Sequence, residues 1–349
     1  MKVSKRILLL KMDHLGDALW SFPALHALRT TFPDCRLDML CTSYLSGVFE
    51  RLDLLDHIFQ YDSAWPLSRR WRALAQLRRT QYDAAIVLGP VDKINHLAFL
   101  SGAKERSGYA YNRNLLRSLA RRGFLTWWKP HPANVAAAAQ RQLPHEVSVM
   151  LELVAQFSSR QYTNTRLFFP LREQERVAAR QRLSELHPNK ARFAILHLCA
   201  KSFRHGWNEQ FLADLADQLQ QALPDTGWII SAGPSEQSCL PAYQAALTNH
   251  RLPVVDDLSL EQMAALLAEA RLLVSWDTGV VHLSTAVGTP VVDIFSDKNF
   301  AYCVQRWGPW QSRSQIIRQE EPAADRRTVE RILQAVIQLT AKDKEATSP

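Results

Sequence analysis

The chain has 349 residues, of which 47% are hydrophobic and 22% are charged, and it contains five cysteines. This length is typical of two domains of roughly 150 to 200 residues each, and the apolar fraction is sufficient for two cores. No run approaches the ~20 apolar residues of a membrane span, and the first apolar run, ILLL, is too short for the core of a signal peptide. Because the cysteines form no CxxC pair, we expect neither a zinc site nor a disulfide framework, and we predict a cytoplasmic protein.

Positive charge is concentrated in the first half of the chain. Residues 1–150 contain 21 Lys and Arg against 12 Asp and Glu, a net charge of +9, whereas residues 151–349 contain 21 against 22, a net charge of −1. Two clusters carry much of the excess: Arg69, Arg70, Arg72, Arg78 and Arg79, and then Arg113, Arg117, Arg121, Arg122 and Lys129. They are either solvated helix faces or a surface for a polyanion. No nucleic-acid-binding motif accompanies them, so an anionic membrane or substrate is favoured.

Short strands and helices alternate along the first half. Strand patterns are predicted at RILLLKM (6–12), RLDMLCT (36–42), HIFQYD (57–62) and YDAAIVLG (82–89). Helical patterns are predicted around 22–30, 66–79, 92–101 and 145–157. This order is typical of βαβ units, and the polar stretch 158–166 is the expected linker.

The second half repeats the alternation. Strand patterns are predicted at 192–199, 227–233, 252–257, 272–276 and 291–295, with helices near 208–222, 236–247 and 259–270. Ser259 and Gln262 have capping-box spacing, which predicts a helix start there. We therefore expect an α/β protein with two Rossmann-like, doubly wound domains facing a central cleft. The expected boundaries are 1–160 and 166–325, followed by a C-terminal helix and tail over 326–349.

The strongest chemical signal is SWDTGVVHLSTAVGTPVVDIF, residues 275–295. A helix of barely two turns lies between two strands, and its first three N–H groups, beginning at Gly279, are predicted to hold a phosphate. The Thr278 hydroxyl is an added donor. His282 lies one turn further and is interpreted as an anion ligand, although alone it would fit a core histidine. Asp277 is a candidate that could also be a plain N-cap.

Further candidates lie where predicted strands end. The loop CAKSFRHGWNEQF (199–211) follows a strand, and open α/β sheets bind ligands at that edge. Its polar candidates are Lys201, Ser202, Arg204 and His205. In AGPSEQ, Glu236 is expected to open a helix and to accept from ribose hydroxyls, or else to pair with the helix dipole. Leu258 is included with them, and together these residues predict a nucleotide site.

The stretch MDHLGDALWSFPAL, residues 12–25, places ionisable groups directly after a predicted strand. Proline is tolerated only in the first turn of a helix, so Pro23 predicts a helix that begins near Ser21 or is kinked there. Asp17 would then precede regular structure. A dinucleotide-dependent oxidoreductase is disfavoured, because this turn has one Gly where GxGxxG needs three and Asp13 would repel a pyrophosphate.

Four segments carry a family resemblance: RILLLKMDHLGDALWSFPALHALR, HEVSVMLELV, the loop ending in GWNEQF, and LSLEQMAALLAEARLLVSWDTGVVHLSTAVGTPVV. They resemble the bacterial lipopolysaccharide heptosyltransferases of glycosyltransferase family 9, over nearly the whole chain. The resemblance implies a GT-B fold, an ADP-heptose donor in the C-terminal domain and a lipopolysaccharide-core acceptor in the N-terminal domain. It also implies inversion at the anomeric carbon without a metal or cofactor.

The resemblance also assigns a role to Asp17, which matches the general base that acts on the acceptor hydroxyl. Apolar neighbours such as Trp20 would raise the pKa of this carboxylate toward neutrality, as a general base requires. Pairing with a helix dipole is the structural alternative. Asp13 and His14 are acceptor-side candidates that hold Asp17 or contact the acceptor.

Two departures from the family pattern bear on the donor. His205 stands two residues before Trp207, where the family usually has Lys, so the diphosphate contact is expected from Arg204 or Lys201. The segment FSDKNF replaces a usual Gly-Pro-Thr turn and leaves the donor sugar open. The basic first half indicates peripheral contact with the anionic inner face of the cytoplasmic membrane. Taken alone, it also allows a non-catalytic protein that binds anionic glycolipids or the membrane surface.

Overall fold

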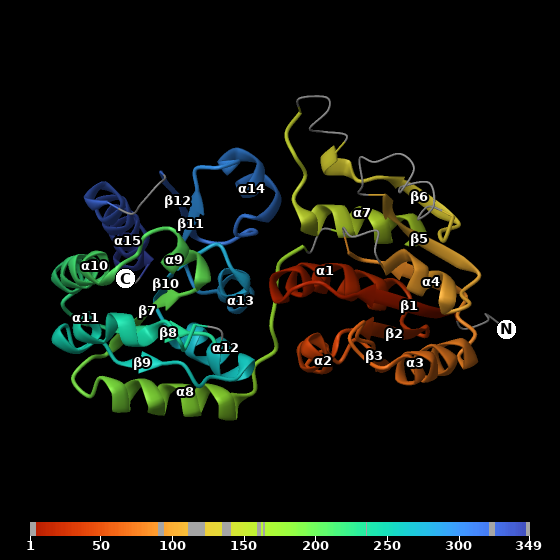
Figure 1. Cartoon of the computed structure of the whole chain (residues 1–349), viewed down its shortest axis with the longest axis horizontal. Coiled ribbons are helices and arrows are strands. Elements are labelled where there is room, and N and C mark those ends of the chain that lie inside the picture. Colours follow the sequence, from red (N-terminus) through yellow and green to blue (C-terminus); the bar gives the residue numbers. More distant parts are fainter. Residues whose placement is uncertain are drawn as a thin grey trace. The chain divides into compact units, whose positions relative to one another are not determined.

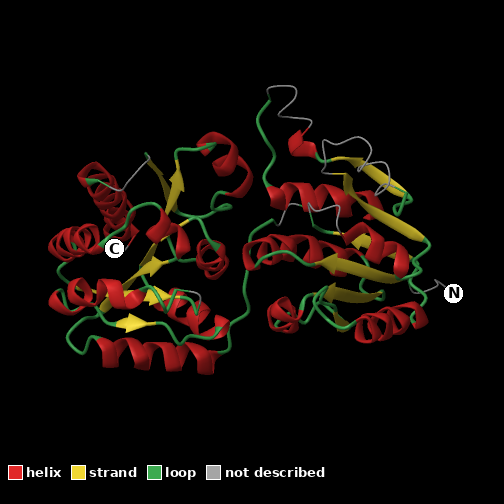
Figure 2. Cartoon of the chain, in the orientation of Figure 1, coloured by secondary structure: helices red, strands yellow, loops and turns green. Residues whose placement is uncertain are grey.

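The computed structural model describes residues 5–89, 94–110, 123–134, 141–158, 162, 165–234, 236–320 and 325–346. The chain divides into two compact units, Met1–Arg166 and Leu167–Pro349. Each unit contains one six-stranded parallel sheet with helices packed against it (Figures 1 and 2). Of the helices that the structure describes, none combines the length and the apolar character needed to cross a membrane.

The sheet of unit 1 has the strand order β3-β2-β1-β4-β5-β6. Its strands are β1 (Arg6–Lys11), β2 (Arg36–Cys41), β3 (His57–Gln60), β4 (Ala84–Val87), β5 (Glu105–Ala110) and β6 (Trp127–Pro130). The order reverses between β1 and β4, which pair in parallel. In doubly wound sheets, the carboxyl ends of the strands at this switch point form the usual ligand site.

Five described helices accompany this sheet: α1 (Leu15–Thr31), α2 (Ser43–Glu50), α3 (Leu67–Arg79), α4 (Asn95–Leu100) and α7 (Glu146–Ser158). The predicted helix start near Ser21 is wrong, because α1 begins at Leu15 and contains Pro23. An internal proline costs about 3 kcal/mol. Burial of each large apolar side chain returns roughly 1.5–3 kcal/mol, and α1 buries Leu19 and Phe22 among others. Packing therefore outweighs the local penalty, and Asp17 lies inside the first turn of α1.

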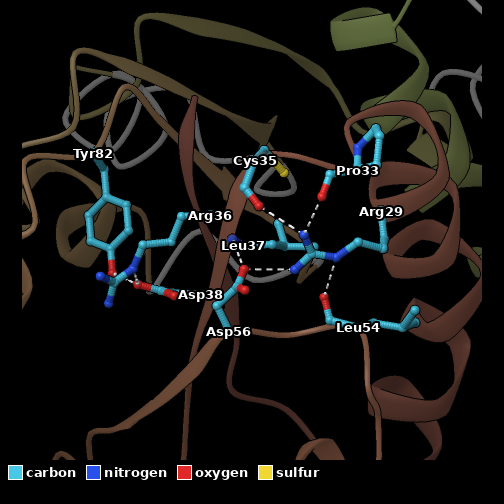
Figure 3. Close-up of polar contacts among 9 residues, drawn as sticks. All are labelled: Arg29, Pro33, Cys35, Arg36, Leu37, Asp38, Leu54, Asp56 and Tyr82. Carbon is cyan, nitrogen blue, oxygen red and sulfur yellow. Dashed lines mark hydrogen bonds and ion pairs between the residues drawn. The ribbon is translucent and has the colours of Figure 1, made fainter. Parts of the chain in front are cut away.

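The last turn of α1 is fastened by Arg29 (Figure 3). Its guanidinium donates to the carbonyl oxygens of Leu54 at 2.9 Å and Cys35 at 2.8 Å, and to the Asp56 carboxylate at 2.7 Å. Asp56 also accepts the Leu37 N–H at 2.7 Å. Although burial opposes it, these bonds lower the pKa of Asp56. The network ties α1 to the starts of β2 and β3, and so fixes where the opposite end of the helix, with Asp17, emerges.

A second polar network, around the buried Asp38, lies in the same sheet (Figure 3). Asp38, fully buried in β2, accepts hydrogen bonds from the Tyr82 hydroxyl at 2.6 Å and from Arg36 Nε at 2.9 Å. Burial, and then the hydrogen bond to Asp38, raise the pKa of Tyr82. These side chains hold β2 to the chain entering β4 and carry no ligand-facing group.

The sheet of unit 2 has the strand order β12-β11-β10-β7-β8-β9. Its strands are β7 (Arg192–Leu198), β8 (Thr226–Ala232), β9 (Val254–Val255), β10 (Leu272–Trp276), β11 (Val291–Ser296) and β12 (Ser314–Gln319). Counted along the chain, this is the same order as in unit 1, with the switch point between β7 and β10. The doubly wound arrangement predicted from the sequence is confirmed in both halves.

The helical segments of unit 2 are α8 (Glu173–Leu186), α9 (Ala200–Arg204), α10 (Glu209–Ala222), η2 (Leu240–Tyr243), α11 (Gln244–Asn249), α12 (Leu260–Glu269), α13 (Gly279–Val287), α14 (Phe300–Trp307) and α15 (Arg326–Ala346). The capping box of α12 is confirmed, since Gln262 Oε1 accepts the Ser259 N–H at 2.8 Å and Ser259 Oγ accepts the Gln262 N–H at 3.3 Å. The predicted helix start at Glu236 is wrong. Glu236 lies in a turn, and η2 follows it.

Candidate active site

In unit 1, a buried lysine connects the ends of the two strands at the switch point. Lys11, fully buried at the end of β1, donates to Asp13 Oδ2 at 2.8 Å and to the carbonyl oxygen of Leu88, beyond β4, at 3.0 Å. A Cβ on Gly89 would lie 2.9 Å from Asp13 Oδ2, so only glycine leaves room for that carboxylate. Asp13 is therefore held between the two strand ends. Sequence reasoning missed Lys11, although a lysine that ends the run ILLL was a signal for it.

Asp17 lies next to this pair, in the first turn of α1. It is half-buried, and its Oδ2 accepts the backbone N–H of His14 at 3.3 Å, while the His14 side chain is exposed. Burial raises the pKa of Asp17, and the charges of Asp13 and Glu146 act in the same direction against that of Lys11. A carboxylate in this environment has increased proton affinity, which is the property expected of a general base.

The first residue of α7, Glu146, is a buried acidic residue close enough to Asp17 to affect its pKa. Glu146, 1% exposed, lies with its Oε2 3.4 Å from His131 Nε2, and His131 is also fully buried. Trp20 packs edge-on against the ring of His145, with ring centroids 5.6 Å apart. Besides the apolar ring of Trp20, which was expected near Asp17, the buried Glu146 also raises the pKa of Asp17. Sequence reasoning missed this charge, although the pair His-Glu at a helix start was visible.

In unit 2, an ion pair crosses the switch point. Lys201, on the short helix α9 that follows β7, donates to Asp277 Oδ2 at 2.7 Å and also to the Asp277 carbonyl oxygen. Asp277 follows β10, so this contact joins the ends of the two central strands. Asp277 is not the cap of α13, because the N-cap residue is Thr278. The lysine ammonium therefore lies beside the N-terminus of α13.

The N-terminus of α13 is partly as predicted. Thr278 is extended at the cap, and its hydroxyl lies 3.5 Å from Ser275 Oγ. Of the three N–H groups expected to be free, that of Val281 donates to the Thr278 carbonyl oxygen at 3.1 Å, so that expectation is wrong for Val281. The N–H groups of Gly279 and Val280 precede it in the same turn. With the positive end of the helix dipole, they retain the chemistry of an anion site.

The remaining cationic and aromatic candidates differ in exposure. His282 is buried, with Nε2 3.9 Å from Asp277 Oδ1. His205 stacks on Trp276, with ring centroids 4.5 Å apart and an interplanar angle of 15°. Arg204 is exposed. The structure thus gathers His282 and Lys201 around Asp277, whereas the Arg204 side chain extends into solvent.

Two of the predicted donor-site residues, Ser202 and Glu236, accept hydrogen bonds from backbone N–H groups of the protein itself. Ser202 is fully buried, and its hydroxyl accepts the Cys199 N–H at 3.2 Å. Glu236 Oε1 accepts the N–H of Ala200 at 3.2 Å. Both side chains fasten the start of α9, which carries Lys201. Leu258 lines a cavity of about 710 Å³ between α8 and α12.

Two buried ionisable residues in the strands of unit 2 were missed. In the sheet, β8, β7, β10 and β11 place Ser231, His197, Ser275 and Asp293 in one row of register partners. Burial lowers the pKa of His197 to about 4, and its Nδ1 lies 3.0 Å from Ser231 Oγ. Asp293 is fully buried. An Asp inside the apolar run VVDIF was the available signal.

The first basic cluster lies on α3. Its apolar face buries Leu74 and Leu77, while the opposite side exposes Arg69, Arg72, Arg78 and Arg79. Arg70 instead donates to the Tyr61 hydroxyl at 2.9 Å. Trp71 and Leu67 are 62% and 67% exposed beside the arginines. Of the second cluster, Arg113, Arg117, Arg121 and Arg122 lie outside the described residues.

Within the described ranges, no group of three or more His, Cys, Asp or Glu side chains is arranged to hold a metal ion. The two switch points carry different functional groups. Unit 1 presents a carboxylate of raised proton affinity at its switch point. Unit 2 presents an ammonium group and a helix N-terminus at its own, which suits a phosphate.

Residues 70–336, more than half of the chain, match the model of glycosyltransferase family 9 (heptosyltransferase). Lipopolysaccharide heptosyltransferase 1 of Pseudomonas aeruginosa is 24% identical over 311 residues, which cover 84% of this chain and 79% of that protein. The structure resembles the ADP-heptose lipopolysaccharide heptosyltransferase II of E. coli with a TM-score of 0.76 and 18% identity, over 97% of this chain and 99% of that one. It resembles E. coli heptosyltransferase WaaC with ADP with a TM-score of 0.69 and 20% identity, over 97% and 99%.

The structural similarity confirms the predicted GT-B fold class, and the family match confirms the resemblance seen in the sequence. The match includes the turn from β10 into α13 and the Lys201 segment. This chain belongs to glycosyltransferase family 9, the heptosyltransferase family.

Proposed function

We propose that this glycosyltransferase moves a heptose, or a closely related sugar, from an ADP-sugar to the inner core of lipopolysaccharide, with inversion at the anomeric carbon and without a metal. The names of its relatives support the donor and the acceptor: one solved structure is of a heptosyltransferase with ADP, and the Pseudomonas aeruginosa relative is a lipopolysaccharide heptosyltransferase. Asp17 carries the mechanistic part of the proposal, because burial raises its pKa at the switch point of unit 1.

In this mechanism, Asp17 accepts the proton of the acceptor hydroxyl while the hydroxyl oxygen attacks the anomeric carbon. The bond from that carbon to the diphosphate oxygen breaks, and ADP leaves from the opposite face. A base with a pKa closer to neutrality takes the proton more readily in the transition state. His14 orients Asp17 through its backbone N–H. Lys11 fixes Asp13 beside it, and Asp13 and the exposed His14 ring are the acceptor-side contacts.

The leaving diphosphate requires positive charge where its negative charge develops. The first N–H groups of α13, the Thr278 hydroxyl and the Lys201 ammonium supply it in this proposal. Asp277 pairs with Lys201, and the buried His282 lies 3.9 Å from Asp277; both stay predicted donor contacts, His282 as an anion ligand. Arg204, His205, Ser202, Glu236 and Leu258 stay predictions for the donor site, the last three acting from buried or cavity-lining positions.

The lipid acceptor brings the enzyme to the anionic inner face of the cytoplasmic membrane in this proposal. Four exposed arginines on α3 supply the attraction, and the exposed Trp71 and Leu67 beside them suit the bilayer interface. The same surface supports the second candidate, a non-catalytic protein that binds anionic glycolipids.

A nucleotide-binding experiment tests the proposal. Thermal shifts are measured with ADP, UDP, GDP and NAD, and transfer is then assayed with ADP-heptose and a lipopolysaccharide-core acceptor. We expect a selective response to ADP and release of ADP that depends on the acceptor. Vesicle binding with equal indifference to all nucleotides would favour the non-catalytic candidate instead.

A further inference from the structure

A carboxyl group is buried in the middle of β11. Asp293 is 0% exposed and is the register partner of Ser275 on β10. Among the described residues, neither of its oxygens makes a hydrogen bond of ordinary geometry, although the Ile294 backbone lies close enough to favour the ionised form weakly. Buried polar groups without partners are rare, so the placement of this carboxyl group requires an explanation.

Asp293 lies diagonally beside Asp277. The Asp277 N–H donates to the carbonyl oxygen of Ile294 at 3.0 Å, which continues the pairing of β10 with β11 by one residue. Asp277 is the first residue after β10 and follows Ser275, the register partner of Asp293, by two positions. The charge of Asp277 acts on Asp293, so the two carboxyl groups lie near each other, with Lys201 bound to Asp277.

The charges around this pair decide the state of Asp293. Burial, and then the charge of Asp277, raise the pKa of Asp293 well above its ordinary value, and Lys201 opposes them. His282 on α13 is 3.9 Å from Asp277. Cys303 on α14 is near the same pair of charges. Burial, and then the charge of Asp277, raise the pKa of its thiol, while Lys201 and Arg306 lower it. Complete burial without an ordinary hydrogen-bond partner among the described residues, and the neighbouring Asp277 carboxylate, thus both favour the protonated form of Asp293, which has an O–H group to donate.

A neutral Asp293 matters for an incoming anion. Lys201 and Asp277 sum to zero charge at the N-terminus of α13. If Asp293 were ionised, that sum would be −1 and would repel a diphosphate. When Lys201 turns from Asp277 to a phosphate oxygen, the Asp277 carboxylate needs a new donor, and the O–H of Asp293 is near it.

We propose that Asp293 is a positioning residue of the donor site, whose O–H group donates to the Asp277 carboxylate when Lys201 binds the diphosphate of a nucleotide sugar. The two carboxyl groups then share the one proton that Asp293 already carries, so none is taken up or released. This inference rests on the proposed function, because it requires a nucleoside diphosphate at α13.

Two substitutions separate charge from hydrogen bonding. Asp293→Asn is neutral at every pH and its amide still donates, whereas Asp293→Leu is branched at the same carbon, is larger and cannot donate. Asp297→Asn is the matched control, since Asp297 is a half-exposed carboxylate just beyond β11 that pairs with Arg318 on β12. Circular dichroism checks that each variant is folded.

The experiment measures the Kd of ADP by calorimetry from neutral to alkaline pH. The ionisation of ADP is the same for all variants, so differences between variants report the protein. Wild type and Asp297→Asn are expected to lose affinity together as pH rises, by about tenfold per pH unit above the pKa of Asp293. Asp293→Asn is expected to show no such loss of ADP affinity. Its Kd should stay near the value that wild type has at neutral pH. Asp293→Leu should bind about tenfold more weakly at neutral pH.

The outcomes distinguish the two levels of the proposal. Wild type that binds ADP with the same pH profile as Asp293→Asn, or Asp293→Leu that binds as wild type does, would overturn the role of Asp293 alone. Wild type that binds no nucleoside diphosphate would overturn the proposed function, and this inference with it.

Discussion

The two units share one strand order but use their switch-point lysines differently. In unit 1 the lysine is the last residue of β1, and its side chain is 0% exposed. In unit 2 it lies three residues beyond the last residue of β7, on α9, and its side chain is 39% exposed. An ammonium inside the sheet is committed to its own carboxylate and carbonyl partners. Lys201 also has a carboxylate and a carbonyl partner, both on Asp277, but its partial exposure lets a ligand reach the ammonium.

The helices that follow these strand ends differ in the same way. The first turn of α1 contains Asp17, whereas the first turn of α13 contains no acidic residue. Burial raises the proton affinity of Asp17, although the positive end of the dipole favours an ionised carboxylate there. Without one, the helix end is suited to an anion. In the proposed mechanism, one topology thus provides a base in one unit and a phosphate site in the other, and the difference lies in the placement of two charges.

The largest expected effect is a loss of stability when the buried Lys11 of unit 1 is replaced. Lys11→Met leaves the Asp13 carboxylate buried without its cation, and removing one partner of a buried pair costs about 3–5 kcal/mol. Chemical denaturation should show this loss of unfolding free energy. The control is Lys104→Met, whose ion pair with Asp83 is on the surface and contributes roughly 0–1 kcal/mol. Equal stability of the two variants would contradict a structural role for Lys11.

The next effect concerns catalysis. Asp17→Asn should lower transfer by on the order of 10² or more with little change in ADP affinity, because a lost base raises the barrier without affecting donor binding. Wild-type kcat/KM should rise with pH as Asp17 ionises, with an inflection above the usual range of Asp because burial raises its pKa. Asp17→Asn should lack that inflection, and Asp53→Asn, at an exposed site, should keep it. Near-normal turnover in Asp17→Asn would remove the residue from the mechanism.

A third effect separates the two lysines. Lys201→Met should weaken ADP binding by about tenfold to a hundredfold, since a hydrogen bond to a charged group contributes about 1.5–3 kcal/mol. Its stability should change far less than that of Lys11→Met, because the Lys201–Asp277 pair is partly exposed. Calorimetry measures the affinity and a thermal melt measures the stability. Unchanged ADP affinity would place the diphosphate elsewhere.

The smallest effect per residue tests the charge difference between the units. Arg72→Glu with Arg79→Glu should weaken binding to anionic vesicles, at about 1 kcal/mol per basic residue near the surface. The same change at Arg326 and Arg327, exposed on α15 of unit 2, should leave vesicle binding intact. Co-sedimentation at low and high salt measures both. Vesicle binding that survives the α3 reversal and high salt would refute this surface.

Local signals were sufficient for the α/β class and for several elements. Apolar runs bounded by turns predicted β1, β2, β7 and β10 within a residue or two, because strand periodicity is written in consecutive residues. The capping box of α12 was predictable for the same reason, since Ser259 and Gln262 are three residues apart. The DTG turn into α13 was likewise visible as a short helix after a strand.

Tertiary structure decided what these local signals left open. The Lys11–Leu88 contact spans 77 positions and Lys201–Asp277 spans 76, so no local pattern announces either. Burial of apolar side chains outweighed the helix-breaking tendency of Pro23. The Glu236 carboxylate accepts a hydrogen bond from Ala200, 36 positions away. Propensities, caps and turns depend on neighbours along the chain and can be read from sequence. The charge that each side chain meets in space depends on how the strands are ordered, and only the folded sheets of the two units set it.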